Sequence, residues 1–222
     1  MRVSAPWYFE LAAKRMHSGG RGGWAMMRAL GALGLLKGCA GFQLRDGTII
    51  EMPLDAPGVH DHTLPDWYEA EAIVRVIDAV NKSAAPFTLV DCGADVGLYS
   101  RLVLAGAKQH ISNVIAFEPN GNIYRILEKN LSPGITGIAS QTFDCGVGEF
   151  DGFGRLVSPG EGASTHAFYI ERAETETDLF VRTLDSFDLP PKTNLILKLD
   201  IEGAELSALR GAGNLLRNAG HL

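Results

Sequence analysis

The stretch from Phe87 to Ser100 constrains the fold of this chain more than any other. A short apolar run ends in Asp91, Gly93 and Gly97 follow four positions apart, and apolar residues return from Leu98. This pattern predicts a β-strand, a sharp turn and the start of a helix. Glycine allows the backbone to approach a ligand closely, and the first N–H groups of a helix can donate to a polar ligand group.

A second apolar run, Val114–Phe117, ends in Glu118, and an acid at the tip of a second strand suits the hydroxyls of a bound ribose. The two strands therefore predict a pocket for a nucleoside cofactor. The dinucleotide fingerprint has a third glycine, which is missing here, and the carboxylate of Asp95 would repel a pyrophosphate. S-adenosylmethionine has no phosphate and carries positive charge, so an acidic loop favours it. An NAD-linked Rossmann oxidoreductase is the alternative enzyme.

Strand and helix patterns alternate from Phe87 onward, which predicts an α/β domain with parallel strands, right-handed crossovers and a ligand across the carboxyl ends of the strands. The predicted strands are Phe87–Asp91, Val114–Glu118, Ile138–Asp144 and Leu195–Asp200. The predicted helices are Trp67–Val80, Leu98–Ala105, Ile123–Leu131 and Glu205–Leu216. Residues 146–193 are too many for a simple crossover and predict a small β excursion over the substrate, with Ser164, Thr165 and His166 as candidate acceptor contacts.

The segment that follows the fourth strand is rich in charge. Period-two alternation places Lys198 and Asp200 on the same side of the strand near its carboxyl end, and Glu202 and Glu205 follow across a turn. Acids at a helix start, with a lysine that neutralises one of them, are ordinary structural features. Beside a cofactor loop, the same groups can orient and deprotonate an acceptor hydroxyl.

Four motifs in this order resemble the FkbM family of S-adenosylmethionine-dependent methyltransferases. They are V-D-C-G-A-D-V-G-L-Y-S at 90–100, F-E-P-N at 117–120, R-T-L-D-S-F at 182–187 and K-L-D-I-E-G-A-E-L-S-A-L-R-G-A at 198–212. Members of that family methylate hydroxyl oxygens on sugars of glycans and on polyketide natural products. The resemblance, which runs from about Tyr68 to the last residue, implies a Rossmann-like class I methyltransferase fold with a mostly parallel sheet. It also implies S-adenosylmethionine as cofactor and a small-molecule or glycan hydroxyl as acceptor.

The resemblance assigns the site residues by position. The methionine part of the cofactor would be cradled by Asp91, Gly93, Ala94, Asp95 and Gly97, with Tyr99 and Ser100 at the adjoining helix start. The ribose would be held by Glu118, with Pro119 and Asn120 beside the adenine and Cys145–Gly146 further along the adenine site. The transferring methyl would be faced by Lys198, Asp200 and Glu202, with Asp200 preferred as the proton acceptor.

The chain departs from the family pattern at two places. Asp95 stands where the family usually has Asn, and the sequence ends at Leu222, just after the helix that follows the fourth strand. Relatives continue with a fifth strand and a final antiparallel pair, so we expect the sheet to lack its last strands. A non-catalytic domain that binds S-adenosylmethionine or acts as a scaffold is therefore a second alternative.

The first 66 residues predict a basic appendage of helix and hairpin, followed by the methyltransferase domain over 67–222. Residues 1–45 sum to +6 within a chain of net charge −6, and the overall charge argues against nucleic acid as the main partner. The hairpin is predicted over Gly41–Met52, with its turn at Asp46-Gly47. A basic helix is predicted from the spacing of Trp24, Met27, Leu30, Leu33 and Leu36. Such an apolar stripe usually packs on its own domain, and peripheral contact with a membrane or a partner is the alternative.

The cysteines and histidines give no sign of a metal site or a disulfide. Three cysteines without such spacing suit a reducing compartment, and a cytoplasmic location is expected. His60 and His62 form a His-x-His pair with no third ligand nearby, so no metal is expected.

Overall fold

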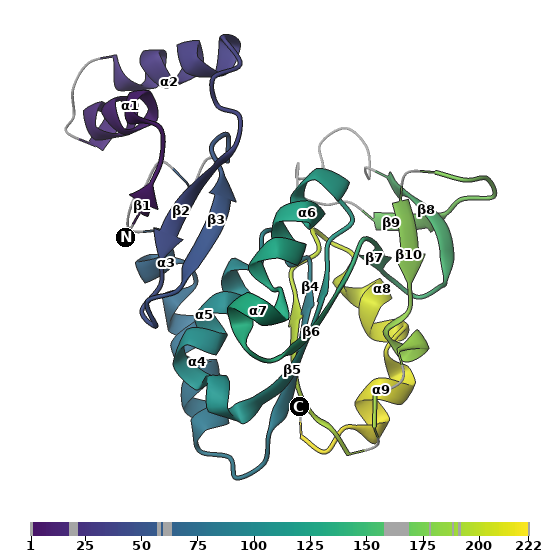
Figure 1. The fold of residues 1–222 in the computed structure, drawn as a ribbon. Helices are drawn as coiled ribbons and strands as arrows, with labels where there is room; N and C mark the ends of the chain where they lie inside the picture. Colours follow the sequence, from purple (N-terminus) through teal and green to yellow (C-terminus); the bar gives the residue numbers. More distant parts are fainter. Residues whose placement is uncertain are drawn as a thin grey trace. The chain divides into compact units, whose positions relative to one another are not determined.

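The computed structural model describes residues 2–17, 22–56, 59, 64–157, 169–177, 179–187, 189–190 and 192–221 (Figure 1). Backbone contacts divide the chain into two compact units, Met1–Arg75 and Val76–Leu222. The domain boundary expected between residues 66 and 67 stays a prediction. Among the described residues, no helix is long and apolar enough to cross a membrane.

The first unit contains a three-stranded antiparallel sheet in the order β1-β2-β3. Its elements are β1 (Arg2–Ser4), α1 (Trp7–His17), α2 (Gly23–Ala32), β2 (Cys39–Gln43), β3 (Ile49–Pro53) and α3 (Leu64–Trp67). The predicted hairpin is confirmed, since Phe42 pairs with Ile50 and the Asp46 carboxylate accepts the Thr48 N–H at the turn. The sequence analysis missed β1 and α1.

Helices α1 and α2 pack closely against each other. A Cβ on Gly23 would lie 2.6 Å from the backbone nitrogen of Met16, so this contact requires glycine. The helix predicted from Trp24 to Leu36 is shorter than expected: α2 ends at Ala32, where Leu33 leaves the helical conformation. Only Met27 and Leu30 of the predicted apolar residues are buried.

The second unit is built on a four-stranded parallel sheet in the order β11-β4-β5-β6. Figure 1 shows α5, α6 and α7 on one face of this sheet and α8 and α9 on the other. Its elements are β4 (Phe87–Cys92), α5 (Leu98–Ala107), η2 (Lys108–His110), β5 (Ile111–Phe117), α6 (Gly121–Asn130), α7 (Pro133–Thr136), β6 (Ala139–Phe143), β11 (Asn194–Leu199), α8 (Glu205–Arg210) and α9 (Gly213–Asn218). The predicted alternation and the Rossmann-like α/β fold are confirmed.

The core of this unit follows the period of the strands. Val90, Ile115 and Leu195 point to the face covered by Ala208 and Ala212, and all five are buried. The neighbouring residues of each strand point to the opposite face. Burial of both faces of β4 and β5 explains why these two strands are nearly continuous apolar runs.

A second sheet leaves the main one between β6 and β11, as the length of that segment predicted. Its strand order is β7-β10-β8-β9, formed by β7 (Gly146–Val147), β8 (Gly152–Val157), β9 (Tyr169–Arg172) and β10 (Leu179–Arg182), and η3 (Leu184–Ser186) follows. The pairing of β7 with β10 is parallel, and the other two pairings are antiparallel. Ser164, Thr165 and His166 lie outside the described residues.

The helix predicted over Glu205–Leu216 is wrong in its length. It divides into α8 and α9 at Gly211, where a Cβ would lie 2.0 Å from the Gly148 carbonyl oxygen. The Asp185 carboxylate then caps the second helix by accepting the N–H groups of Asn214 and Leu215 at 2.9 and 2.8 Å. Gly148 and Asp185, which determine this division, are both distant in sequence from the helices.

The helix predicted over Trp67–Val80 is confirmed as α4 (Ala70–Asn81), which begins three residues later than predicted, after α3 has ended at Trp67. Between α3 and α4 the backbone of Glu69 takes a positive φ of 43°, which no helix accommodates.

Candidate functional site

The glycine loop after β4 folds back over the end of β5. The N–H groups of Gly93 and Ala94 both donate to the Phe117 carbonyl oxygen, at 3.1 and 2.9 Å. Gly93 and Gly97 have φ values of 72° and 84°, in the region that favours glycine. A Cβ on Gly93 would lie 2.0 Å from the Asp200 carbonyl oxygen, so the predicted close approach is one between two segments of the protein's own backbone.

Asp91 and Ser100 support this loop from below. Both are completely buried, and the Ser100 hydroxyl donates to Asp91 Oδ2 at 2.6 Å. Parallel pairing of β4 with β11 sets Asp91 beside Lys198, whose Nζ is 3.3 Å from Asp91 Oδ1. Because Asp91 has no exposed surface, its carboxylate stabilises the loop and does not contact the cavity.

Lys198 joins β11 to the same loop. Its Nζ donates to the Gly93 carbonyl at 2.9 Å, lies 3.5 Å from Asp200 Oδ2, and sits over the Tyr99 ring at 5.7 Å. Only 9% of its side chain is exposed. Burial alone would lower the pKa of this ammonium, but the Asp91 and Asp200 carboxylates outweigh it and the pKa is raised. Lys198 therefore carries charge at neutral pH and fixes the loop.

Glu118, at the tip of β5, holds two segments together. Its Oε2 accepts the Asp95 N–H at 3.0 Å and its Oε1 accepts the Asn120 N–H at 2.9 Å, and Asn120 in turn caps α6. Desolvation raises the pKa of both Glu118 and Asp95. The sequence predicted the position of Glu118 at this edge but missed its role in fixing the loop.

The loop after β11 presents Asp200. The Asp200 N–H donates to the Cys92 carbonyl at 3.1 Å, while 54% of its side chain is exposed. Glu205 Oε1 accepts the N–H groups of Ile201 and Gly203. Desolvation alone would raise the pKa of Glu205, but the hydrogen bonds from the backbone N–H groups outweigh it and the pKa is lowered. Glu205 thus stabilises the turn that carries Asp200 and Glu202.

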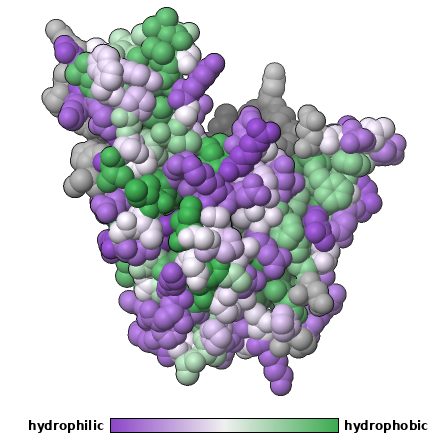
Figure 2. All heavy atoms as spheres, viewed as in Figure 1, coloured by the Kyte–Doolittle hydropathy of each residue, from purple (hydrophilic) through white to green (hydrophobic). Residues whose placement is uncertain are grey.

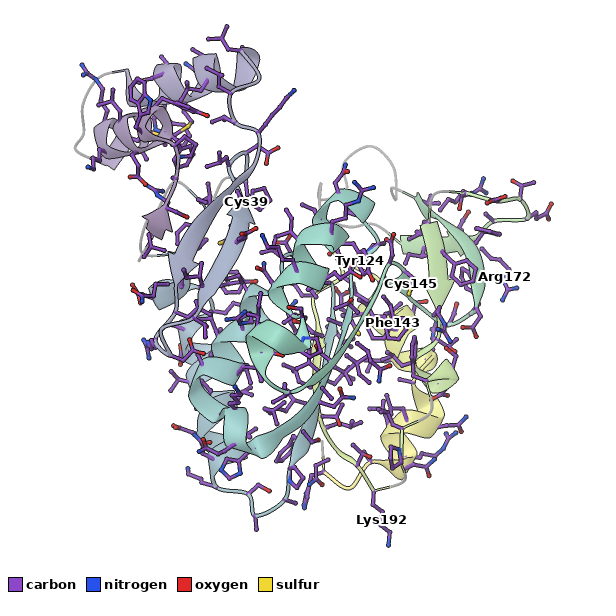
Figure 3. All side chains as sticks on the ribbon, viewed as in Figure 1. Cys39, Tyr124, Phe143, Cys145, Arg172 and Lys192 are labelled. Atoms are coloured by element: carbon purple, nitrogen blue, oxygen red, sulfur yellow. The ribbon has the colours of Figure 1, made fainter. Side chains whose placement is uncertain are left out.

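A cavity of about 330 Å³ lies among these loops. Seven predicted site residues line it: Gly93, Glu118, Pro119, Cys145, Gly146, Asp200 and Glu202. The others, which do not line it, are Asp91, Ala94, Asp95, Gly97, Tyr99, Ser100, Asn120 and Lys198. Figure 3 labels Cys145 together with Phe143 and Tyr124, where β6 ends.

Five lining residues were missed by the sequence analysis: Phe117, Val147, Ile170, Leu179 and Ile201. Ile170 and Leu179 belong to the second sheet, and they contact the space above Gly146, where a Cβ would lie 3.2 Å from Leu179 Cδ1. The only sequence signal for them was the excess length of residues 146–193. They give the cavity an apolar wall.

The character of the cavity fits S-adenosylmethionine. Three carboxylates, those of Glu118, Asp200 and Glu202, line it. This charge attracts a sulfonium or ammonium group and repels a pyrophosphate. Its size lies within the range of roughly 300–1,000 Å³ typical of small-molecule sites, and its apolar wall suits a nucleobase.

Burial disfavours the thiolate form of Cys92 and Cys145. Burial raises the pKa of Cys145 to about 11 and raises that of Cys92 further. Within the described ranges, no cluster of three or more histidine, cysteine or acidic residues is arranged to hold a metal ion.

A family profile described as the methyltransferase FkbM domain matches residues 91–219. A search of curated proteins found no match. Among solved structures, the chain is similar to a methyltransferase FkbM from Methylobacillus flagellatus KT, with 22% sequence identity and a TM-score of 0.39. The similarity covers 73% of this chain and 42% of that one, so the chain spans less than half the length of this solved relative.

Proposed function

The chain belongs to the FkbM methyltransferase family, and from this we propose that it methylates an acceptor hydroxyl with S-adenosylmethionine as the methyl donor. The observation that carries the proposal is the cavity in which Gly93, Glu118 and Asp200 meet. These residues come from the ends of three adjacent parallel strands, where ligands of open α/β sheets bind.

Residues of the cavity divide into two groups by chemistry. Glu118, Pro119 and Gly146, with the apolar wall of the second sheet, would hold the nucleoside. Asp200 and Glu202 would face the cationic sulfonium of the cofactor. Bound S-adenosylmethionine supplies an electrophilic methyl group attached to a sulfonium. Ile170, Leu179 and Ile201 would exclude water from this space.

Asp200 is the group best placed to accept a proton from the acceptor hydroxyl. Its carboxylate is exposed to the cavity, whereas Asp91 and Glu205 are engaged in structural contacts. Lys198 pairs with Asp200 at 3.5 Å and would hold its orientation. A positioned base typically contributes roughly 10²–10⁴-fold to the rate, and orientation of the hydroxyl adds to it.

The acceptor class proposed is a sugar, glycan or natural-product hydroxyl. Carboxylates accept hydrogen bonds from hydroxyl groups, and Asp200 and Glu202 both line the cavity. A polyhydroxylated acceptor offers several such donors.

The test combines cofactor binding with methyl transfer. Calorimetry with S-adenosylmethionine and with NAD identifies the cofactor, and transfer of a labelled methyl group is measured against a panel of sugars, glycans and hydroxylated polyketides. Asp200→Asn should abolish turnover and leave cofactor affinity within a few-fold, whereas Asp78→Asn on the exposed side of α4 should change neither.

Three results contradict parts of the proposal. Full turnover in Asp200→Asn would remove this residue from the role of base. Binding of S-adenosylmethionine without transfer to any acceptor would favour a non-catalytic domain, and binding of NAD alone would favour an oxidoreductase.

A further inference from the structure

Helix α1 presents a face that is apolar at one end and basic at the other. Its exposed residues are Trp7, Leu11, Lys14 and Arg15, spaced so that they share one side of the helix. Trp7 is 77% exposed and Leu11 is 49% exposed. The opposite side packs into the core of the first unit, so this exposure belongs to the folded helix.

Helix α2 and the turn after it repeat the composition. Trp24 is 65% exposed and Leu33 is 73% exposed, with the exposed Arg28 between them. Tyr8 Oη donates to the Leu35 carbonyl at 3.1 Å, which ties the end of this segment back to α1. We call α1, α2 and residues 33–37 the α1–α2 pair.

Trp7, Leu11, Trp24 and Leu33 are all exposed on the α1–α2 pair, and contiguous exposed apolar surface is typical of protein or membrane interaction sites. Figure 2 shows hydrophobic and hydrophilic residues side by side over the first unit. Tryptophan is the residue most typical of the interface between water and lipid, because its ring is apolar and its N–H needs a polar partner.

The exposed charged residues of the α1–α2 pair are basic. Lys14, Arg15, Arg28 and Lys37 are exposed. The one acid among residues 1–45 is Glu10, which is half-buried and binds Arg2 at 2.7 Å. The surface of the pair is therefore basic next to apolar, and no exposed carboxylate occurs along α1 or α2 in the parts that the structure describes.

We propose that the α1–α2 pair is a peripheral membrane-binding surface for bilayers rich in anionic lipid. The basic side chains attract the lipid headgroups, and Trp7, Leu11 and Leu33 enter the interfacial region. A second copy of the chain is a poor occupant because it would bring like charges together. Nucleic acid is also a poor occupant, because exposed leucines make no favourable contact with a phosphate backbone and the chain as a whole carries a net charge of −6.

The surface is tested by vesicle co-sedimentation of the full chain. Vesicles of phosphatidylcholine alone are compared with vesicles that contain phosphatidylserine, and brominated lipids are used to quench tryptophan fluorescence. The protein should bind the anionic vesicles, be released by salt, and show quenching. Failure to bind anionic vesicles overturns the proposal, as does binding without quenching.

Two sets of variants assign binding to the face. Lys14→Gln with Arg28→Gln should weaken binding roughly 25-fold, at about fivefold per charge. Trp7→Ser with Leu11→Ser should weaken vesicle binding at least tenfold, because the double variant loses at least the free energy of burying about one large apolar side chain in the interface. All four residues are exposed, so the fold should persist, which circular dichroism verifies.

Matched controls lie in the second unit. Lys82→Gln with Arg125→Gln removes two exposed charges there, and Leu206→Ser removes an apolar residue that is 61% exposed. Neither should change vesicle binding. Equal losses in the controls overturn the proposal, and so does a dimer or an RNA complex that depends on the α1–α2 pair while vesicles stay unbound.

Discussion

Replacing Gly93 by alanine tests how closely the loop after β4 packs on the end of β11. The new Cβ would lie 2.0 Å from the Asp200 carbonyl oxygen and 2.9 Å from its carbonyl carbon, and backbone atoms cannot turn aside. Gly93 also has a φ of 72°, which costs an L-residue about 1–2 kcal/mol. Overpacking adds about 1–3 kcal/mol, so the free energy of unfolding should fall by about 2–5 kcal/mol.

Gly137→Ala is a matched control in the same unit. Gly137 has a φ of 67°, and the nearest atom to its added Cβ is Lys108 Nζ at 2.8 Å, at the end of a flexible side chain. This substitution should therefore show only the backbone cost of about 1–2 kcal/mol.

The assay is urea denaturation of the full chain followed by circular dichroism, together with calorimetry of S-adenosylmethionine binding. Because Gly93→Ala must displace the backbone beside Asp200, it should also weaken cofactor binding, whereas Gly137→Ala should not. If the two variants lose equal stability and both bind the cofactor as the wild type does, the close packing of Gly93 on Asp200 is refuted.

Three further predictions concern the charged groups. Ser100→Ala should cost about 1.5–3 kcal/mol in thermal or urea denaturation, because it removes a hydrogen bond to the buried Asp91 carboxylate; an unchanged midpoint would contradict this. Lys198→Met should cost roughly 3–5 kcal/mol by leaving that carboxylate unpaired, and adding Asp91→Asn should restore part of the loss; additive costs in this double-mutant cycle would speak against the pairing. Desolvation raises the pKa of Glu118 above 4.5, so affinity for S-adenosylmethionine should fall as the pH is lowered through that raised pKa, since protonation removes a negative charge. The stability of the protein without ligand depends on pH in the opposite direction, because the stabilisation from the neutral Glu118 carboxyl is lost as pH rises through the folded pKa. Glu118→Gln should flatten the pH profile of cofactor affinity. Asp95→Asn should keep the part of that profile that is due to Glu118.

Local patterns were enough to predict the framework of the second unit. The apolar runs that become β4, β5 and β11 each precede an acid, and the glycines after β4 mark the turn. Strand periodicity and turn chemistry are properties of consecutive residues, so they can be derived from the sequence. The same information placed Glu118 and Asp200 at one edge of the sheet.

The partners of these residues depended on tertiary structure. Lys198 and Gly93 are 105 positions apart, and parallel pairing with β4 is what directs the ammonium to the Gly93 carbonyl and to Asp91. The sequence analysis predicted that Lys198 faces the transferring methyl, and the structure shows its Nζ bound to the loop. Burial and hydrogen bonding are decided by whichever segments meet in space.

The sequence by itself determined the alternation of strands and helices, the glycine turn and the acidic strand tips. Only the tertiary structure decided that Ile170 and Leu179 wall the cavity, that Gly211 and Asp185 divide the last helix, and that Trp7 and Leu11 remain exposed on α1. The physical reason is range: backbone preference acts between near neighbours along the chain, whereas packing, desolvation and ion pairing act between atoms that only folding brings together.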